Sequence, residues 1–292
     1  MTTMPKHKLL IEYDKLREQA QKALYSPDNT KTLDSIYRQS QKVIGKLSQV
    51  QLKSQVTGKE YFAFKKGTKM SRAINKALYE PEYENWELLQ KAMQGNNLQD
   101  VTRELITKTL YTMAISFCAA IDILKSGDQK TPGTFFEYFV AYFFAWRVGV
   151  EPTTSIQVLS VDGEDTKLRT DFIFNLGEKK RKFHMPIKTS TRERSIMLWA
   201  HQRLLDGVYG VERFMGTPVL LTETKTDKKK KDVVEICLPE QWRVYQLYIA
   251  KLKRVYYLDL PEAYIRLNLE FPPLNVRPFA DFFYEWDELS PS

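Results

Sequence analysis

The sequence predicts an α/β protein in which a mixed central sheet is flanked by helices and preceded by an all-helical N-terminal unit. Three observations support this prediction. Apolar residues recur at helical spacing over residues 6–125, and short β-branched or aromatic runs separated by polar clusters follow. Helical patterns near 194–213 and 240–255 interrupt those runs, which is typical of helices packed against a sheet. We therefore expect a helical domain over 1–125 and a second domain over 126–292.

The helical unit is predicted from the spacing of its apolar residues. In the first segment they recur every three or four positions, at Leu9, Leu10, Tyr13, Leu16 and Ala20. The range 101–124 continues the same pattern, while polar stretches at 26–29 and 95–97 interrupt it. These features predict helices joined by short loops.

The second part begins with a loop at 126–133 and an aromatic-rich apolar helix, TFFEYFVAYFFAWRVG. Five runs of β composition follow, namely SIQVLSV, LRTDFIFNL, RKFHMPIKTS, TPVLLTET and DVVEICL. The chain reverses at 175–179, so the second and third runs are expected to form an antiparallel hairpin.

Length and composition narrow the functional class. The 292 residues suit one large or two moderate domains, and 44 Lys plus Arg against 36 Asp plus Glu give a net charge of +8, which favours a polyanionic partner. Cys118 and Cys237 have no nearby Cys or His, which argues against a zinc site and predicts a reducing compartment. The N-terminus lacks a signal-peptide core, and no uncharged apolar stretch reaches roughly 20 residues. We expect a cytoplasmic protein with no membrane partner.

Glu137 is the only charged residue between Thr134 and Trp146 in the aromatic-rich helix. A helix that is apolar on nearly all sides is buried, and a buried carboxylate needs a partner that offsets its desolvation. A satisfied structural glutamate is one explanation, and a carboxylate of a functional site is the other.

Asp171 and Lys188 lie on the two strands of the predicted hairpin. If Asp171 pairs with Pro186, Lys188 pairs with Arg169, and Asp171 and Lys188 become diagonal neighbours on one face. A slip of one residue would separate them, and a surface salt bridge is the alternative. An Asp, a Lys and a Glu together suit phosphodiester hydrolysis, because carboxylates bind Mg²⁺ and a Lys orients water and offsets charge on the phosphate.

These residues resemble a known nuclease signature. Asp171, followed by PIK at 186–188, resembles the PD-(D/E)XK motif, with Thr170 in place of the Pro and Ile187 in place of the second acid. GTFFEYF, TDFIF and IKTSTRER together resemble the type II restriction endonucleases that recognise CCGG, CCNGG or CCWGG cores. The resemblance covers roughly residues 131–224.

The resemblance implies a PD-(D/E)XK core and Mg²⁺-dependent cleavage of double-stranded DNA at a short palindromic site, for which we favour a CCGG-type core. It implies that Asp171, Glu137 and the Ile187 carbonyl hold the metal and that Lys188 acts at the phosphate. A palindromic site suits a two-fold protein, so a homodimer is expected, and higher oligomers stay open.

Arg192, Glu193 and Arg194 follow the predicted catalytic strand. Arg presents two parallel donors to guanine, and Glu accepts from the cytosine amino group, so this triplet suits the reading of adjacent G·C pairs. A solvated surface turn is the alternative, and the resemblance favours DNA binding.

One departure concerns a further acid that relatives often carry thirteen or fourteen residues beyond the catalytic Lys. Here those positions hold His201 and Gln202. We include Gln202 among the catalytic candidates, because its amide oxygen is able to coordinate a metal or a metal-bound water, although it brings no charge. His201 is the alternative general base, and a hydrogen-bonded core histidine is the competing explanation.

Three rival functions remain open. A repair or structure-specific nuclease on the same core would cut without depending on Arg192 and Glu193. A DNA-binding module that has lost catalysis would bind and not cleave. A helical adaptor with a basic surface would bind an acidic protein.

Overall fold

The structure is a computed structural model that describes residues 6–161, 164–178, 180–227 and 232–289. The chain forms two compact units. Unit 1 comprises Met1–Trp146 and Lys225–Val234, and unit 2 comprises Arg147–Thr224 and Glu235–Ser292. The expected domain boundary at residue 125 therefore falls inside unit 1.

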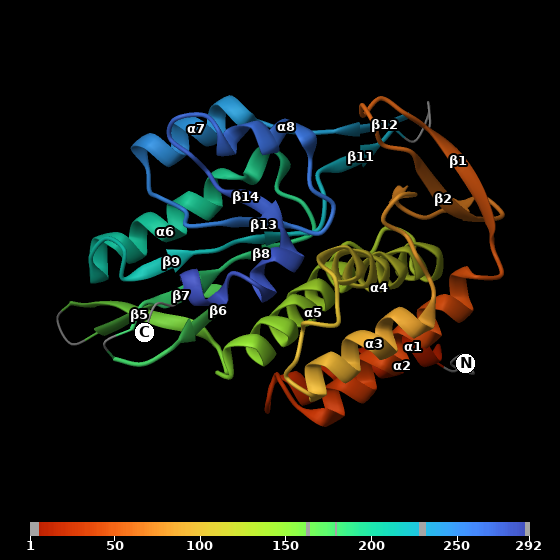
Figure 1. The fold of residues 1–292 in the computed structure, drawn as a ribbon, viewed down its shortest axis with the longest axis horizontal. Coiled ribbons are helices and arrows are strands. Elements are labelled where there is room, and N and C mark those ends of the chain that lie inside the picture. The colour runs from red at the N-terminus through yellow and green to blue at the C-terminus, as the bar shows by residue number, and fades with distance from the viewer. Residues whose placement is uncertain (1–5, 162–163, 179, 228–231, 290–292) are drawn as a thin grey trace. The chain divides into compact units, whose positions relative to one another are not determined.

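Unit 1 is built around five helices (Figure 1): α1 (Lys8–Ala20), α2 (Pro27–Ile44), α3 (Tyr83–Gln94), α4 (Arg103–Leu124) and α5 (Lys130–Val148), the last of which runs into unit 2. The Ser26 hydroxyl caps α2 by accepting from the Asn29 N–H at 3.2 Å. By length and composition α4 is able to cross a membrane, but most of it is buried in the structure, and core helices of soluble proteins pass the same test.

The prediction that the N-terminal unit is all-helical is wrong. Unit 1 also contains β1 (Ser48–Ser54), β2 (Tyr61–Lys66), β3 (Lys69–Met70) and β4 (Ile74–Asn75), and β1 pairs with β2 in an antiparallel hairpin. A segment from much later in the chain, β12 (Asp232–Glu235), adds to β1 in parallel and buries Val233 against the hairpin. The partner that buries these strands is distant in sequence, so local periodicity does not reveal them.

Unit 2 contains a curled mixed sheet. The strands β5 (Thr153–Val161), β6 (Glu164–Asn175), β7 (Lys182–Met185) and β9 (Phe214–Gly216) form one part. The strands β8 (Ile187–Lys188), β10 (Val219–Leu220), β13 (Val255–Tyr257) and β14 (Val276–Pro278) form the other. Pairing is continuous from one part to the other, because the Thr217 N–H donates to His184 O and the Val219 N–H donates to Pro186 O.

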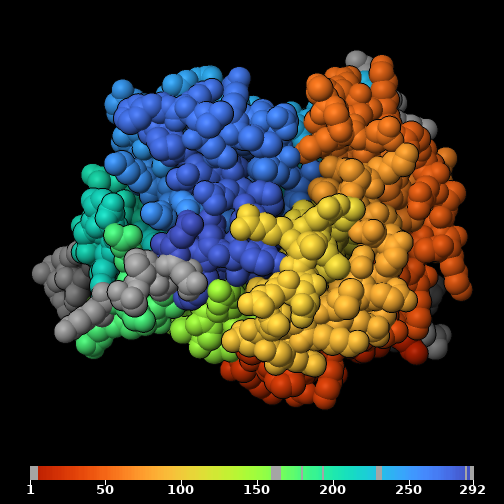
Figure 2. Space-filling model, viewed as in Figure 1, coloured from red at the N-terminus to blue at the C-terminus, as the bar shows by residue number. Residues whose placement is uncertain are grey.

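Helices cover this sheet. The buried side chains of α6 (Ile196–Tyr209) and α7 (Pro239–Tyr248), Trp199 and Trp242 among them, pack in one cluster with Leu220 and Tyr257 of the sheet. The remaining elements of the described residues are β11 (Thr224–Thr226), α8 (Glu262–Ile265), α9 (Trp286–Leu289) and the short 3-10 helices Arg192–Arg194, Arg266–Asn268 and Phe279–Phe283. Together, α7 and the segments after it, blue in Figure 2, gather on one face of unit 2.

A buried polar network lies behind the β6–β7 hairpin. His184 is fully buried, and its Nδ1 lies 3.3 Å from Gln202 Oε1. The Gln202 Nε2 donates to Asp206 Oδ1 and to the Phe214 carbonyl, both at 2.9 Å. Gly216 makes room for this network, because a Cβ there would lie 2.7 Å from Gln202 Oε1.

We expect stability to fall in acid through His184. Burial lowers the pKa of its imidazole from 6.5 to about 3, so between these values the unfolded chain binds a proton that the folded state does not. The stability that the neutral His184 contributes is fully present above pH 6.5. Below pH 6.5 the free energy of unfolding falls by up to about 1.4 kcal/mol for each pH unit. Urea unfolding of the wild type and of His184→Gln from pH 7.5 to 5 measures it, and equal pH slopes for the two proteins would contradict the assignment.

Candidate active site

The structure brings Asp171 and Lys188 together. The β6–β7 pairs Phe172–Met185 and Ile173–His184 have the register that the sequence predicts, and the same offset aligns Asp171 with position 186. Lys188 Nζ lies 2.6 Å from Asp171 Oδ2, and the Ile187 N–H donates to the same oxygen at 2.7 Å. The Lys188 side chain is 45% exposed, so the pair is reachable from solvent.

The Ile187 carbonyl lies on the Asp171 side of its strand. The carbonyls of Pro186 and Lys188 accept from the N–H groups of Val219 and Leu221 in the neighbouring strand. Because successive carbonyls of an extended strand point in opposite directions, the Ile187 carbonyl points away from that neighbour.

A carboxylate and a carbonyl are ligands that suit Mg²⁺, which commonly keeps waters and binds substrate phosphate with only one or two carboxylates. Asp171 and the Ile187 carbonyl fit such an ion. The described part of the chain contains no group of three or more His, Cys, Asp or Glu side chains placed to hold a metal.

His201 and Gln202, the candidates for a further site residue on α6, differ in their surroundings. His201 is half-buried on α6, and burial lowers its pKa, while the charge of Asp171 raises it and that of Lys188 lowers it. Gln202 is only 1% exposed and hydrogen bonds inside the buried network, so its contacts are structural. This placement gives no support to the expectation that Gln202 acts in the site.

Glu137 lies on α5, in unit 1, and is half-buried, whereas Phe136 and Phe139 of the same helix are fully buried. The helix is the one that the sequence predicts. That Glu137 joins Asp171 at a metal stays a prediction.

The triplet Arg192–Arg194 forms a short 3-10 helix between the strand of Lys188 and α6, where the sequence places it. Arg194 is exposed, whereas Arg192 is half-buried, with its Nη2 3.5 Å from the Thr224 carbonyl. Arg192 has a φ of 46°, a left-handed backbone conformation that is uncommon for a residue other than glycine. The Glu193 side chain lies outside the described residues.

Sequence reasoning missed Glu223, which is fully buried next to this triplet. It accepts from the Thr191 hydroxyl at 2.6 Å, from the N–H groups of Thr191 and Arg192 at 3.1 and 3.0 Å, and from the Tyr257 hydroxyl at 3.0 Å. Burial raises its pKa, and these hydrogen bonds lower it. The signal in the sequence was an acid directly after the apolar run VLLT. The sequence predicts this run to be a strand, which could pair with the strand of Lys188.

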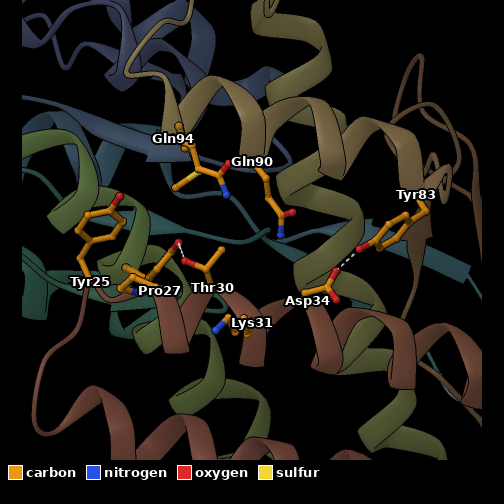
Figure 3. Close-up of a pocket in the computed structure, with 10 residues that line it drawn as sticks. Tyr25, Pro27, Thr30, Lys31, Asp34, Tyr83, Gln90 and Gln94 are labelled. Carbon is orange, nitrogen blue, oxygen red and sulfur yellow. Dashed lines mark hydrogen bonds between the residues drawn. The ribbon is translucent and has the colours of Figure 1, made fainter.

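Unit 1 contains a cavity of about 410 Å³ between α2 and α3 (Figure 3). At one end Asp34 accepts from the Tyr83 hydroxyl and from Trp86 Nε1, and Tyr25 lies at the other end. Thr30 and Tyr142 hydrogen bond to each other in its wall. The cavity contains none of the site residues predicted from the sequence.

No protein-family model matches the chain, and no curated protein matches it. Among solved structures, the type IIP restriction endonuclease Kpn2I is similar, with a TM-score of 0.81, 23% sequence identity and coverage of 97% of this chain and 98% of that chain. The restriction endonuclease PspGI, in complex with substrate DNA, has a TM-score of 0.42 and 13% identity, and the match covers 70% of this chain and 92% of that chain. The chain therefore has the fold of the restriction endonuclease Kpn2I, a curled mixed sheet with helices.

Proposed function

We propose that this protein is a type II restriction endonuclease that cleaves double-stranded DNA at a short palindromic site with a CCGG-type core and depends on Mg²⁺. One observation carries the proposal: Lys188 Nζ of β8 lies 2.6 Å from Asp171 Oδ2 of β6. The fold shared with Kpn2I supports the same reading.

Asp171 and the Ile187 carbonyl would hold the metal ion. When bound, Mg²⁺ supplies electrophilic stabilisation of the phosphate and acidifies bound water. The Lys188 ammonium, fixed by Asp171, orients the attacking water and offsets the negative charge that develops on the phosphate. Water adds to phosphorus, the P–O3′ bond breaks, and the products carry a 5′-phosphate and a 3′-hydroxyl.

Base recognition is assigned to Arg192, Glu193 and Arg194. Arginine donates in pairs to guanine, and glutamate accepts from cytosine, so the triplet suits a G·C-rich core. The net charge of +8 favours phosphate contacts that hold the duplex without reading its sequence. A palindromic target requires two copies of the triplet, which a homodimer provides.

The proposal is tested by incubating the purified protein with unmethylated phage DNA and Mg²⁺ and sequencing the fragment ends. We expect discrete fragments whose ends share a CCGG or CCNGG core. Fragments without a common sequence would favour a repair or structure-specific nuclease. DNA that is bound but stays intact in both Mg²⁺ and Mn²⁺ would favour a binding module without catalysis.

Replacement of Lys188 by Ala should abolish measurable cutting, with a loss of about 10²- to 10⁴-fold or more, because it removes the group that acts on the water and the phosphate. Binding of the specific site in Ca²⁺ should stay largely intact. Lys251→Ala, which removes an exposed Lys elsewhere in unit 2, is the control. Undiminished cleavage by Lys188→Ala would remove the proposed site.

Arg192→Ala should lose about 1 to 3 kcal/mol of discrimination at the base pair that Arg192 reads. Binding in Ca²⁺ to the specific site and to duplexes with one altered base pair measures this difference. Arg203→Ala, at an exposed position of α6, is the matched control. A loss of affinity that is equal for all duplexes would show a phosphate contact instead.

A further inference from the structure

We infer that Glu223 is a positioning residue for sequence recognition: its buried carboxylate holds the backbone of Thr191 and Arg192 and thereby sets the direction in which the Arg192–Arg194 triplet leaves the sheet. The inference rests on the proposed function, because it concerns how the site distinguishes DNA sequences.

The first support is that both oxygens of the buried Glu223 carboxylate accept hydrogen bonds. Glu223 is 0% exposed, and its two oxygens accept from two backbone N–H groups, a threonine hydroxyl and a tyrosine hydroxyl. A buried carboxylate is costly unless hydrogen bonds of this kind satisfy it. Four hydrogen bonds to one carboxylate therefore fix the position of the Glu223 side chain. They also fix the position of Thr191 and Arg192, which supply three of the four donors.

The second support is where those donors lie. The N–H groups at the start of a helical turn have no partner within the turn, and a side chain or another group must satisfy them. Thr191 precedes the triplet, and its own hydroxyl donates to Glu223 at 2.6 Å instead of capping the turn. Glu223 thus acts as a cap supplied by the segment between β10 and β11.

The third support is the backbone of Arg192. Its φ of 46° is a conformation that residues with a Cβ rarely adopt, and it persists only where the surroundings fix it. Glu223 Oε2 lies 3.0 Å from the Arg192 nitrogen, and the Arg194 N–H donates to the Thr191 carbonyl at 2.9 Å. These two bonds fix the nitrogen of Arg192 and the carbonyl of Thr191, which belong to the same peptide group.

The bonds of Glu223 differ from those that orient the catalytic pair. Asp171 accepts from Ile187 and Lys188, whereas Glu223 accepts from Thr191, Arg192 and Tyr257. Loss of the Glu223 carboxylate should therefore affect the choice of sequence more than the hydrolytic step.

The test compares Glu223→Gln with the wild type on the specific site and on sites with one core base pair changed. We expect the ratio of kcat/KM between these sites to fall about 10- to 100-fold, because a glutamine amide group is a donor where backbone N–H groups need an acceptor. Tyr257→Phe keeps the ring and removes one donor to Glu223, and it should lower the ratio in the same direction by a smaller factor.

Glu285→Gln is the matched control. Glu285 is another buried carboxylate of unit 2, and it accepts from Arg254, Arg277 and the Tyr256 hydroxyl. This variant should lose stability in thermal unfolding while its ratio of kcat/KM values stays that of the wild type.

An unchanged ratio in both Glu223→Gln and Tyr257→Phe would overturn the inference while leaving the proposed function intact. An equal loss of kcat/KM on every site would also overturn it, since that result indicates general destabilisation. A wild-type protein that does not discriminate among the sites would overturn the proposed function itself, and with it this inference.

Discussion

The proposed site depends on the register of one hairpin, the antiparallel pairing of β6 with β7. Side chains alternate between the faces of a strand, so a slip of one residue would move Asp171 and Lys188 to opposite faces. The Ile187 N–H also bonds to the Asp171 carboxylate, which links a side chain of β6 to the backbone of β8, the strand that follows β7. The hairpin is held by pairing with β5 on one side and β9 on the other, so neither of its strands is an edge.

The buried polar side chains of His184 and Gln202 stabilise the position of the β6–β7 hairpin. His184 stays uncharged because of its burial, and Gln202 joins it to Asp206 of α6 and to the Phe214 carbonyl. A buried network of this kind is stabilising when all of its members are satisfied, and it specifies one packing of helix on sheet. The position of α6 against the sheet follows from that packing.

Much of this arrangement was predictable from the sequence. The alternation in LRTDFIFNL and the turn after it predict the hairpin, and the offset to HMPIK predicts the meeting of Asp171 with Lys188, which the structure confirms. Gln202 and His201 could not be told apart, because adjacent residues of one helix point in different directions and the sequence does not show which direction faces the sheet. Glu223 could not be assigned, because two of its four donors are backbone N–H groups, which every residue except proline carries.

The excursion of residues 225–234 has a consequence for how the protein can be divided. The chain passes from unit 1 to unit 2 after Trp146, returns at Lys225 to place β12 beside β1, and leaves again after Val234. No single cut of the chain therefore yields both units whole. In a fragment that ends at Trp146, β1 would keep β2 on one side, and its other side would be an edge open to other chains. A fragment that begins at Arg147 would carry β12 without β1, its partner. Glu223 directly precedes β11, so the residue that bonds to Thr191 and Arg192 is covalently continuous with the segment that adds β12 to the sheet of unit 1.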